Sequence, residues 1–455
     1  MDSRLNGTRL RLLSDSIMNP FNLLSNVSIA SRRIKFSGLM QLLLASLFLL
    51  SNPLRADDWP QWRGKHRDGI SEETGLLKEW PKQGPKLQWE AKDAVSGYST
   101  PAIVGEKLYL LGNQGLDNEF VEALSATDGK RVWSTRLGKV GNPEQQPKFP
   151  AARSTPTVEG DSLYTLSSDG DLACVAITTG KVTWHKSLRS DFGGKPGIWA
   201  YSESPLIDGE ALICTPGGAD ATLIALNKKS GEVIWKCAVP GGAEAAYSSA
   251  IIVDTAGTKQ YVQMLNDGLV GVEARTGKFL WRYNKIKSRF SANIPTPVAQ
   301  DGQIYSAGAG TGAGLIKLKK DSSGVGFDEV YFSPKLPTAI GGEVRLGDVI
   351  YGTTGEELLC FEFATGKVKW DDRALGTASL CYADGRLYLH GENGEVGLVE
   401  ASSDGYHEKG RFAPPNQPGR LIQMEKAWTY PVVANGRLYI RDHDHVWCYN
   451  IKAGK

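Results

Sequence analysis

At residues 179–184 the chain reads Thr-Gly-Lys-Val-Thr-Trp, and this ending returns with small changes along the sequence. It reads Ser-Gly-Glu-Val-Ile-Trp at 230–235, Thr-Gly-Lys-Phe-Leu-Trp at 276–281 and Thr-Gly-Lys-Val-Lys-Trp at 365–370. The closing aromatic residue recurs every 38 to 51 residues between Trp89 and Phe412, and in one interval it is Phe332. A period of several tens of residues indicates a repeat architecture in which each unit packs on its neighbours.

Each repeat contains about four short runs of alternating apolar residues separated by glycine, aspartate, asparagine and serine, which predicts strands and tight turns. Four antiparallel strands per repeat are typical of a β-propeller blade. An aromatic strand around Trp89 precedes the first repeat start, and the last repeat ends at Tyr449 without such a strand. We therefore predict an all-β, eight-bladed propeller over residues 86–455, with a ring closed by the N-terminal strand in the last blade.

The recurring tryptophans are interpreted as structural, because a large apolar ring between two blades stabilises their packing. A small alanine precedes each Thr-Gly-Lys turn and leaves room for such a ring. The predicted docking residues are Trp89, Trp133, Trp184, Trp235, Trp281 and Trp370.

Ala176-x-x-x-Gly180-x-x-x-Trp184 resembles the docking motif of the pyrroloquinoline quinone (PQQ)-type propeller repeat, and Ala274 to Trp281 shows it one residue shorter. The resemblance covers about four fifths of the chain and implies the fold. Two branches share this repeat: quinoprotein dehydrogenases, and non-catalytic propellers such as the BamB lipoprotein of outer-membrane assembly. The fold alone does not choose between them.

The N-terminal 56 residues read as a secretory signal peptide. An apolar stretch from Leu39 to Leu50 follows Arg32 and Arg33, and Ala56 marks a cleavage site before Asp57. The apolar stretch is short for a membrane span, although an uncleaved anchor is the alternative. We expect a periplasmic or secreted protein that is not transmembrane after cleavage.

Charge is best judged on the mature chain. Without the seven bases and two acids of the leader, 45 basic and 48 acidic residues remain, for a net charge of −3. No nucleic-acid partner is expected, since that function requires a basic surface.

The six cysteines are scattered through predicted strands and contain no Cys-x-x-Cys pair. The pattern favours buried free thiols, with a Cys214–Cys237 disulfide as the alternative in an oxidising compartment.

Residues 57–85 lie outside the repeats and open with Asp-Trp-Pro-Gln-Trp-Arg-Gly at 58–64. Two tryptophans around a proline favour burial, so we interpret this segment as a strap packed on the propeller. A docking peptide for a partner is the alternative.

The connections from the outer strand of one blade to the inner strand of the next are long, at 139–153, 189–203, 284–293 and 413–428. Long loops on a rigid scaffold commonly carry binding. Basic and aromatic side chains there predict a face for a protein or peptide partner, or for a small anionic or sugar ligand; the alternative is ordinary solvated loops. The candidates are Arg153, Lys195, Trp199, Tyr201 and Arg289.

A PQQ enzyme would need a Ca²⁺ ion held by oxygen ligands. Glu203 and Asn293 lie in loops of the expected face and are the candidate ligands, although no matched set accompanies them. The stretch Asp-His-Asp-His at 442–445 falls in a predicted hairpin and reads as a solvated turn rather than a metal site. The glycine-rich 308–314 reads as another hairpin, because no helix follows it.

The sequence thus favours a non-catalytic binding or assembly scaffold of the cell envelope, with no catalytic residues and no cofactor. The alternative is a quinoprotein dehydrogenase of the alcohol or polyvinyl-alcohol type, which would use PQQ and Ca²⁺.

Overall fold

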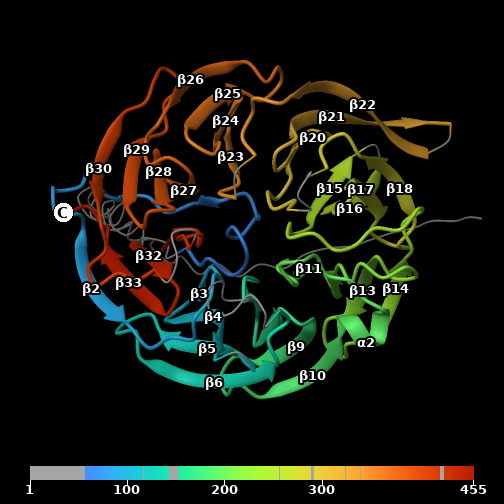
Figure 1. Cartoon of the computed structure of the whole chain (residues 1–455), viewed down its shortest axis with the longest axis horizontal. Coiled ribbons are helices and arrows are strands. Elements are labelled where there is room, and N and C mark those ends of the chain that lie inside the picture. Colours follow the sequence, from blue (N-terminus) through green and yellow to red (C-terminus); the bar gives the residue numbers. More distant parts are fainter. Residues whose placement is uncertain are drawn as a thin grey trace, which may run out of the picture. The chain divides into compact units, whose positions relative to one another are not determined.

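The computed structural model describes residues 57–455, except for 116, 143–151, 256, 288–291, 323, 339, 421–424 and 455. The proposed signal peptide and Arg289 therefore lie outside the described residues. Strands arranged in eight sheets form a ring, as Figure 1 shows. The described part holds one short helix, α2 (Leu188–Phe192), and no helix in it is long and apolar enough to cross a membrane.

The first four blades follow one another along the chain, each with its innermost strand first. Blade 1 contains β3 (Ala102–Val104), β4 (Lys107–Gln114), β5 (Asn118–Ser125) and β6 (Arg131–Gly138). Blade 2 contains β7 (Thr157–Glu159), β8 (Ser162–Leu166), β9 (Asp171–Ala176) and β10 (Val182–Ser187). Blade 3 contains β11 (Leu206–Asp208), β12 (Ala211–Cys214), β13 (Leu223–Asn227) and β14 (Val233–Cys237). Blade 4 contains β15 (Ile251–Thr255), β16 (Thr258–Leu265), β17 (Gly268–Glu273) and β18 (Phe279–Tyr283).

The next three blades repeat this order. Blade 5 contains β19 (Val298–Gln300), β20 (Gln303–Gly308), β21 (Gly312–Asp321) and β22 (Gly324–Ser333). Blade 6 contains β23 (Glu343–Leu346), β24 (Val349–Thr353), β25 (Leu358–Glu362) and β26 (Val368–Asp372). Blade 7 contains β27 (Ala378–Ala383), β28 (Arg386–Gly391), β29 (Val396–Glu400) and β30 (Glu408–Phe412), and the short β1 (Ile70–Ser71) is added to its inner edge. The glycine-rich stretch 308–314 is the hairpin between β20 and β21, as predicted.

Blade 8 closes the ring with both ends of the repeat region. It contains β31 (Val432–Ala434), β32 (Arg437–Asp442) and β33 (His445–Asn450), and its outer strand is β2 (Lys86–Ala91). β2 pairs antiparallel with β33, with Glu90 opposite Trp447. The predicted eight-bladed fold and its closure by the Trp89 strand are confirmed.

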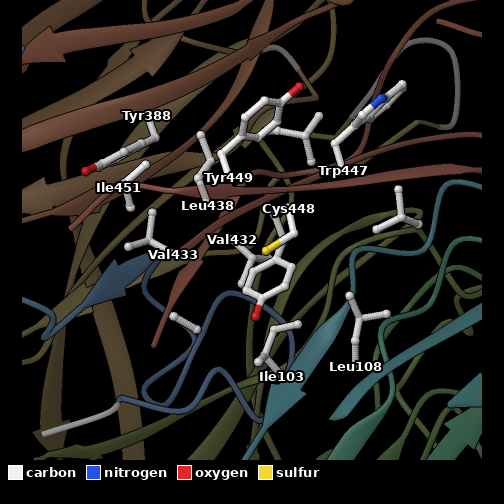
Figure 2. Close-up of a cluster of buried hydrophobic side chains, with 14 of the residues drawn as sticks. Ile103, Leu108, Tyr388, Val432, Val433, Leu438, Trp447, Cys448, Tyr449 and Ile451 are labelled. Carbon is white, nitrogen blue, oxygen red and sulfur yellow. The ribbon is translucent and has the colours of Figure 1, made fainter. Parts of the chain in front are cut away.

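A continuous apolar core joins blade 8 to both neighbours. In Figure 2, Cys448 and Val432 lie on the side of Ile103 of blade 1, and Tyr449 lies on the side of Tyr388 of blade 7. Successive strand residues point to opposite faces, so blade 8 packs on both sides at once. All six cysteines are buried and free, as predicted.

The outer tryptophans link neighbouring blades by a repeated hydrogen bond. In five blades the indole N–H donates to a backbone carbonyl after the third strand of the next blade, at 2.9–3.0 Å. The donor and acceptor pairs are Trp89–Ala126, Trp133–Ile177, Trp184–Lys228, Trp235–Ala274 and Trp370–Ser402. The glycine of the facing turn is needed for two reasons: Gly277 has a φ of +74°, and a Cβ there would lie 2.5 Å from the Trp235 ring.

Three blades depart from this arrangement, and in one of them, blade 7, the position is held by Phe412, which has no hydrogen-bond donor. Trp281 donates to Gln260 Oε1 of its own blade at 2.7 Å and packs edge-on against Phe327 of blade 5. In blade 5 the sequence period places the closing aromatic residue at Phe332, but Phe332 does not make this contact. Tyr331 donates to the Phe363 carbonyl of blade 6 at 2.9 Å, because adjacent residues of a strand point to opposite faces.

Residues 58–71, here called the axial segment, run through the centre of the ring (Figure 1). Trp59 exchanges two backbone hydrogen bonds with Ile103 of blade 1, and β1 pairs in parallel with β27 of blade 7. Arg63 is buried and donates to the Glu343 carbonyl of blade 6. Arg67 is also buried and donates to the Ser204 and Pro205 carbonyls of blade 3 at 2.9 and 3.1 Å. The chain itself thus fills part of the channel through the ring.

Candidate functional site

The long connections between blades lie on one face of the ring, here called the loop face; the turns between first and second strands lie on the other, the turn face. Each connection ends by entering an inner strand from the loop face. In six blades, the residue four positions before the inner strand lines one cavity near the ring axis. These residues are Tyr98, Arg153, Ser202, Tyr247, Ile294 and Trp428.

This axial cavity has a volume of about 330 Å³. Its wall is completed by Trp62 of the axial segment and by Trp199, Thr100, Ala292, Ile340 and Tyr430. A mostly apolar concave site with a few polar groups is the usual form of a small-molecule or side-chain binding site.

Trp62 is held in place by two contacts. Its indole N–H donates to Thr296 Oγ1 at 2.8 Å, and its ring meets Tyr430 edge-on at 4.7 Å between centroids. The Tyr430 hydroxyl in turn donates to the Ile340 carbonyl at 2.6 Å. The axial segment therefore forms one wall of the cavity and separates it from the channel below.

Arg153 brings the positive charge of the cavity against its aromatic rings. Its guanidinium lies 5.6 Å from the Tyr98 ring centroid and 6.0 Å from that of Trp199, and Nη1 donates to the Trp199 carbonyl at 2.8 Å. Burial lowers the pKa of Arg153 and raises that of Tyr98. An arginine nevertheless stays protonated in proteins. The cavity can therefore hold a flat or apolar group and favours a negative over a positive one.

The structure brings together two of the five residues predicted for this face. Arg153 and Trp199 share the cavity wall, whereas Lys195 and Tyr201 lie behind it. The Lys195 backbone N–H and the Tyr201 hydroxyl both donate to the Pro216 carbonyl at 2.8 Å. The Lys195 side chain is exposed and Tyr201 is buried, so Tyr201 supports the loop from beneath. Arg289 lies outside the described residues.

Glu203 and Asn293, the candidate Ca²⁺ ligands, lie next to cavity residues but do not line the cavity. The Glu203 carboxylate accepts from Thr215 N–H and, at 2.9 Å, from Gln263 Nε2. The Asn293 amide donates to the Leu265 carbonyl at 2.8 Å. Burial raises the pKa of Glu203 to about 7. A Ca²⁺ ion would have to displace these hydrogen bonds within and between blades, so the residues do not fit such a site.

The hairpin at 442–445 is predicted correctly as a turn but wrongly as solvated. Asp442 and His443 are 2% and 7% exposed. Two residues that precede β31 cover the hairpin: Arg420 donates to both Asp442 carboxylate oxygens at 2.9 and 2.6 Å, and Glu425 Oε1 lies 3.5 Å from His443 Nδ1. Among the described residues no three His, Cys, Asp or Glu side chains are placed to share a metal.

Most of the cavity wall was missed from the sequence. Tyr98, Tyr247, Trp428 and Tyr430 carry no motif of their own. A usable signal was present, because the repeat starts fix the position four residues before each inner strand. Trp62 gave no such signal, since the axial segment lies outside the repeats.

The chain matches a family model and several curated proteins. The family model described as outer membrane protein assembly factor BamB matches residues 117–372, more than half of the chain. BamB of Shewanella oneidensis is 24% identical over 314 residues, covering 64% of this chain and 68% of that protein. BamB of Moranella endobia is 26% identical over 126 residues, 27% of this chain, and the match spans only 31% of that protein. The resemblance to the PQQ-type repeat is confirmed.

Solved structures share the fold. BamB from Moraxella catarrhalis superposes with a TM-score of 0.55 at 16% identity, covering 78% of this chain and 95% of that one. The quinohemoprotein alcohol dehydrogenase from Comamonas testosteroni superposes with a TM-score of 0.60 at 12% identity, covering 90% and 82%. At such identities the likeness concerns the propeller architecture alone.

Proposed function

Because this chain belongs to the family of the outer membrane protein assembly factor BamB, we propose that it is a non-catalytic binding scaffold of the cell envelope. Its loop face holds a protein partner. The family name supports a role in assembly at the outer membrane, and the rigid ring with long connections on one face supports a surface built for binding.

The observation that carries this proposal is an exposed apolar residue in a connection on the loop face. Ile198, in the connection between blades 2 and 3, is 63% exposed, the largest value among the exposed large hydrophobic residues described. It borders a hollow of about 390 Å³ lined by Arg189, Lys195 and Glu244, among others. An apolar centre with a polar rim is the usual arrangement of a protein interface.

The loop under Ile198 is rigidly held. Asn142 Nδ2 donates to the Ile198 carbonyl at 2.6 Å, and the Tyr247 hydroxyl accepts from Trp199 N–H at 3.1 Å. A Cβ at Gly197 would lie 2.2 Å from the Tyr247 hydroxyl oxygen, so the loop approaches blade 4 closely. A preorganised loop lowers the entropy cost of binding.

The test is affinity capture of the tagged protein from crosslinked envelopes. Ile198→Asp should reduce the captured partner at least about tenfold, as expected for a central apolar anchor. Ile234→Asp is the matched control, since Ile234 is 49% exposed on the outer strand β14. Equal capture by the two variants would contradict the proposal.

The proposed location in the cell envelope depends on cleavage of the signal peptide, whose residues lie outside the part of the chain that the structure describes. We propose cleavage after Ala56, and N-terminal sequencing of envelope material should read from Asp57. Material that retains residues before Leu39 would instead support an uncleaved anchor.

The quinoprotein dehydrogenase remains the second candidate, because the axial cavity offers aromatic walls and one positive charge. We propose that no PQQ and no Ca²⁺ are used, since Glu203 and Asn293 are engaged between blades. Titration with PQQ should show no Ca²⁺-dependent binding, and a dye-linked assay with alcohols should show no reduction. Ca²⁺-dependent binding that Glu203→Gln abolishes would establish the enzyme instead.

A further inference from the structure

The axial segment covers the inner strand edges of some blades and leaves others open. It bridges β3 through Trp59, and the Pro60 carbonyl accepts from Val158 of β7 at 2.8 Å. In blade 7, β1 pairs with β27, with Ile70 opposite Tyr382. The axial segment thus pairs with the channel-side edges of blades 1 and 7 and makes one backbone hydrogen bond to that of blade 2.

The inner edges of blades 4 and 5 have no such partner. β15 and β19 are edge strands of their sheets, and within the described residues no backbone hydrogen bond reaches them from outside their own blades. In an edge strand, alternate residues direct their N–H and C=O groups away from the paired neighbour. Such a row of unpaired groups is a template for another strand.

Space for another strand is present beside these edges. A second cavity of about 490 Å³ lies in the channel between the axial segment and the inner strands of blades 3 to 6. Its wall includes Ile251 and Ile252 of β15 and residues 298–300 of β19. Ile252 is 38% exposed and offers an apolar contact beside the open edge. We call this space the channel groove.

The charges of the groove select the ligand. Lys65, Arg67 and Arg345 bring three positive charges to its wall, against Asp68 in the wall and Glu72 beside Lys65. Arg345 Nε has no hydrogen-bond partner among the described residues. Lys65 and His66 are exposed and lie 3.5 and 3.7 Å from Glu72, so this end of the groove opens to solvent. A basic rim favours an acidic ligand.

We propose that the channel groove is a second binding site, which takes an extended acidic peptide segment by adding it as a strand to β15 or β19. Main-chain hydrogen bonds to the open edge supply affinity, Ile252 contacts an apolar side chain, and the basic rim receives the carboxylates. The pairing of β1 with β27 shows that an inner edge of this ring accepts an added strand.

The site is distinct from the loop-face patch around Ile198. The groove is lined by residues of the inner strands themselves, whereas the loop-face cavities are lined by the connections that precede them. A substitution that abolishes binding at one site should therefore leave binding at the other unchanged. The Ile198→Asp variant should bind the peptide like the wild type.

The test uses the purified protein and a short fluorescent peptide of alternating valine, threonine and glutamate. Binding is measured by anisotropy, and protection of β15 and β19 amides by hydrogen exchange. The acidic peptide should bind at least about tenfold more tightly than the same peptide with lysine for glutamate. N-methylation of alternate peptide amides should abolish binding, because it removes the donors of a strand ladder.

Two substitutions locate the site. Ile252→Glu should weaken the acidic peptide at least about tenfold by repulsion and lost apolar contact, whereas Ile234→Glu on the outer strand should leave it unchanged. Absence of binding, binding that survives N-methylation, or protection confined to other strands would each overturn the proposal. The peptide modifications require no protein variant, so they decide the matter even if Ile252→Glu misfolds.

Discussion

The two ends of the central channel are built from different parts of the chain, the connections between blades at one end and the inner strands at the other. At the loop face, the axial cavity is lined by side chains from one repeat position in six blades, and three of these side chains are aromatic. Beyond Trp62, the channel groove is lined by residues of the inner strands and by basic side chains of the axial segment. The repeats supply the ring, and a segment outside the repeats divides its centre into an aromatic and a basic compartment. Function in such a ring thus depends on where non-repeating residues enter it.

Removal of the N-terminal segment should have the largest effect. Deleting residues 57–92 removes β2 and exposes the edge of β33, so the protein should aggregate. Deleting only 57–85 keeps β2 and should give a soluble monomer that melts at a lower temperature. Size-exclusion chromatography separates the two outcomes, and a monomeric 57–92 deletion with unchanged melting would contradict the closure.

Loss of the partition at Trp62 should have a smaller effect. Trp62→Ala should lower the free energy of unfolding by about 2 kcal/mol, because a partly buried aromatic ring is lost. Trp62→Phe keeps an aromatic ring but removes the hydrogen bond to Thr296, which should lower the free energy of unfolding by about 1 kcal/mol. Denaturant unfolding measures both. Equal losses would mean that the ring itself contributes little to the partition.

The buried carboxyl of Glu343, beside Arg63 of the axial segment, should make stability depend on pH. Burial raises the pKa of Glu343 to about 8. A raised carboxyl pKa favours the folded state below the unfolded pKa of about 4.3, and that contribution is lost as pH rises toward 8. The wild type should therefore lose more unfolding free energy than Glu343→Gln between pH 5 and pH 8. The difference between the two losses should be at least about 1 kcal/mol. Parallel pH profiles of the two proteins would refute this role.

Surface changes at the partner patch should barely alter stability. Ile198→Asp and Ile234→Asp both replace exposed side chains, so each should change the free energy of unfolding by less than about 0.5 kcal/mol. Thermal melts check this. A large loss in Ile198→Asp alone would mean that its loop is part of the core, and that capture experiments with it report misfolding.

The sequence was sufficient for the ring because blade packing is periodic. The tryptophan spacing predicted the blade number, and the orphan strand at Trp89 predicted the closure. The hydrogen bond from five of the outer indoles to the next blade explains why that spacing is kept.

The site was less predictable because its contacts are not local. Arg153 and Trp199 were found as basic and aromatic loop residues, but only the folded chain places them against Tyr98 and Trp428. Burial of Asp442 depended on Arg420, a residue in a separate connection. The path of the axial segment follows no period, so neither the partition at Trp62 nor the open edges of blades 4 and 5 could be read from the repeats.

The central claim, that the loop face binds a protein partner in the envelope, is tested most directly by photo-crosslinking in intact cells. A photoreactive residue would be placed at position 198 and, in a matched strain, at position 234. We expect a discrete crosslinked protein from position 198 that position 234 does not give. The same products from both positions, or products from position 234 alone, would contradict it.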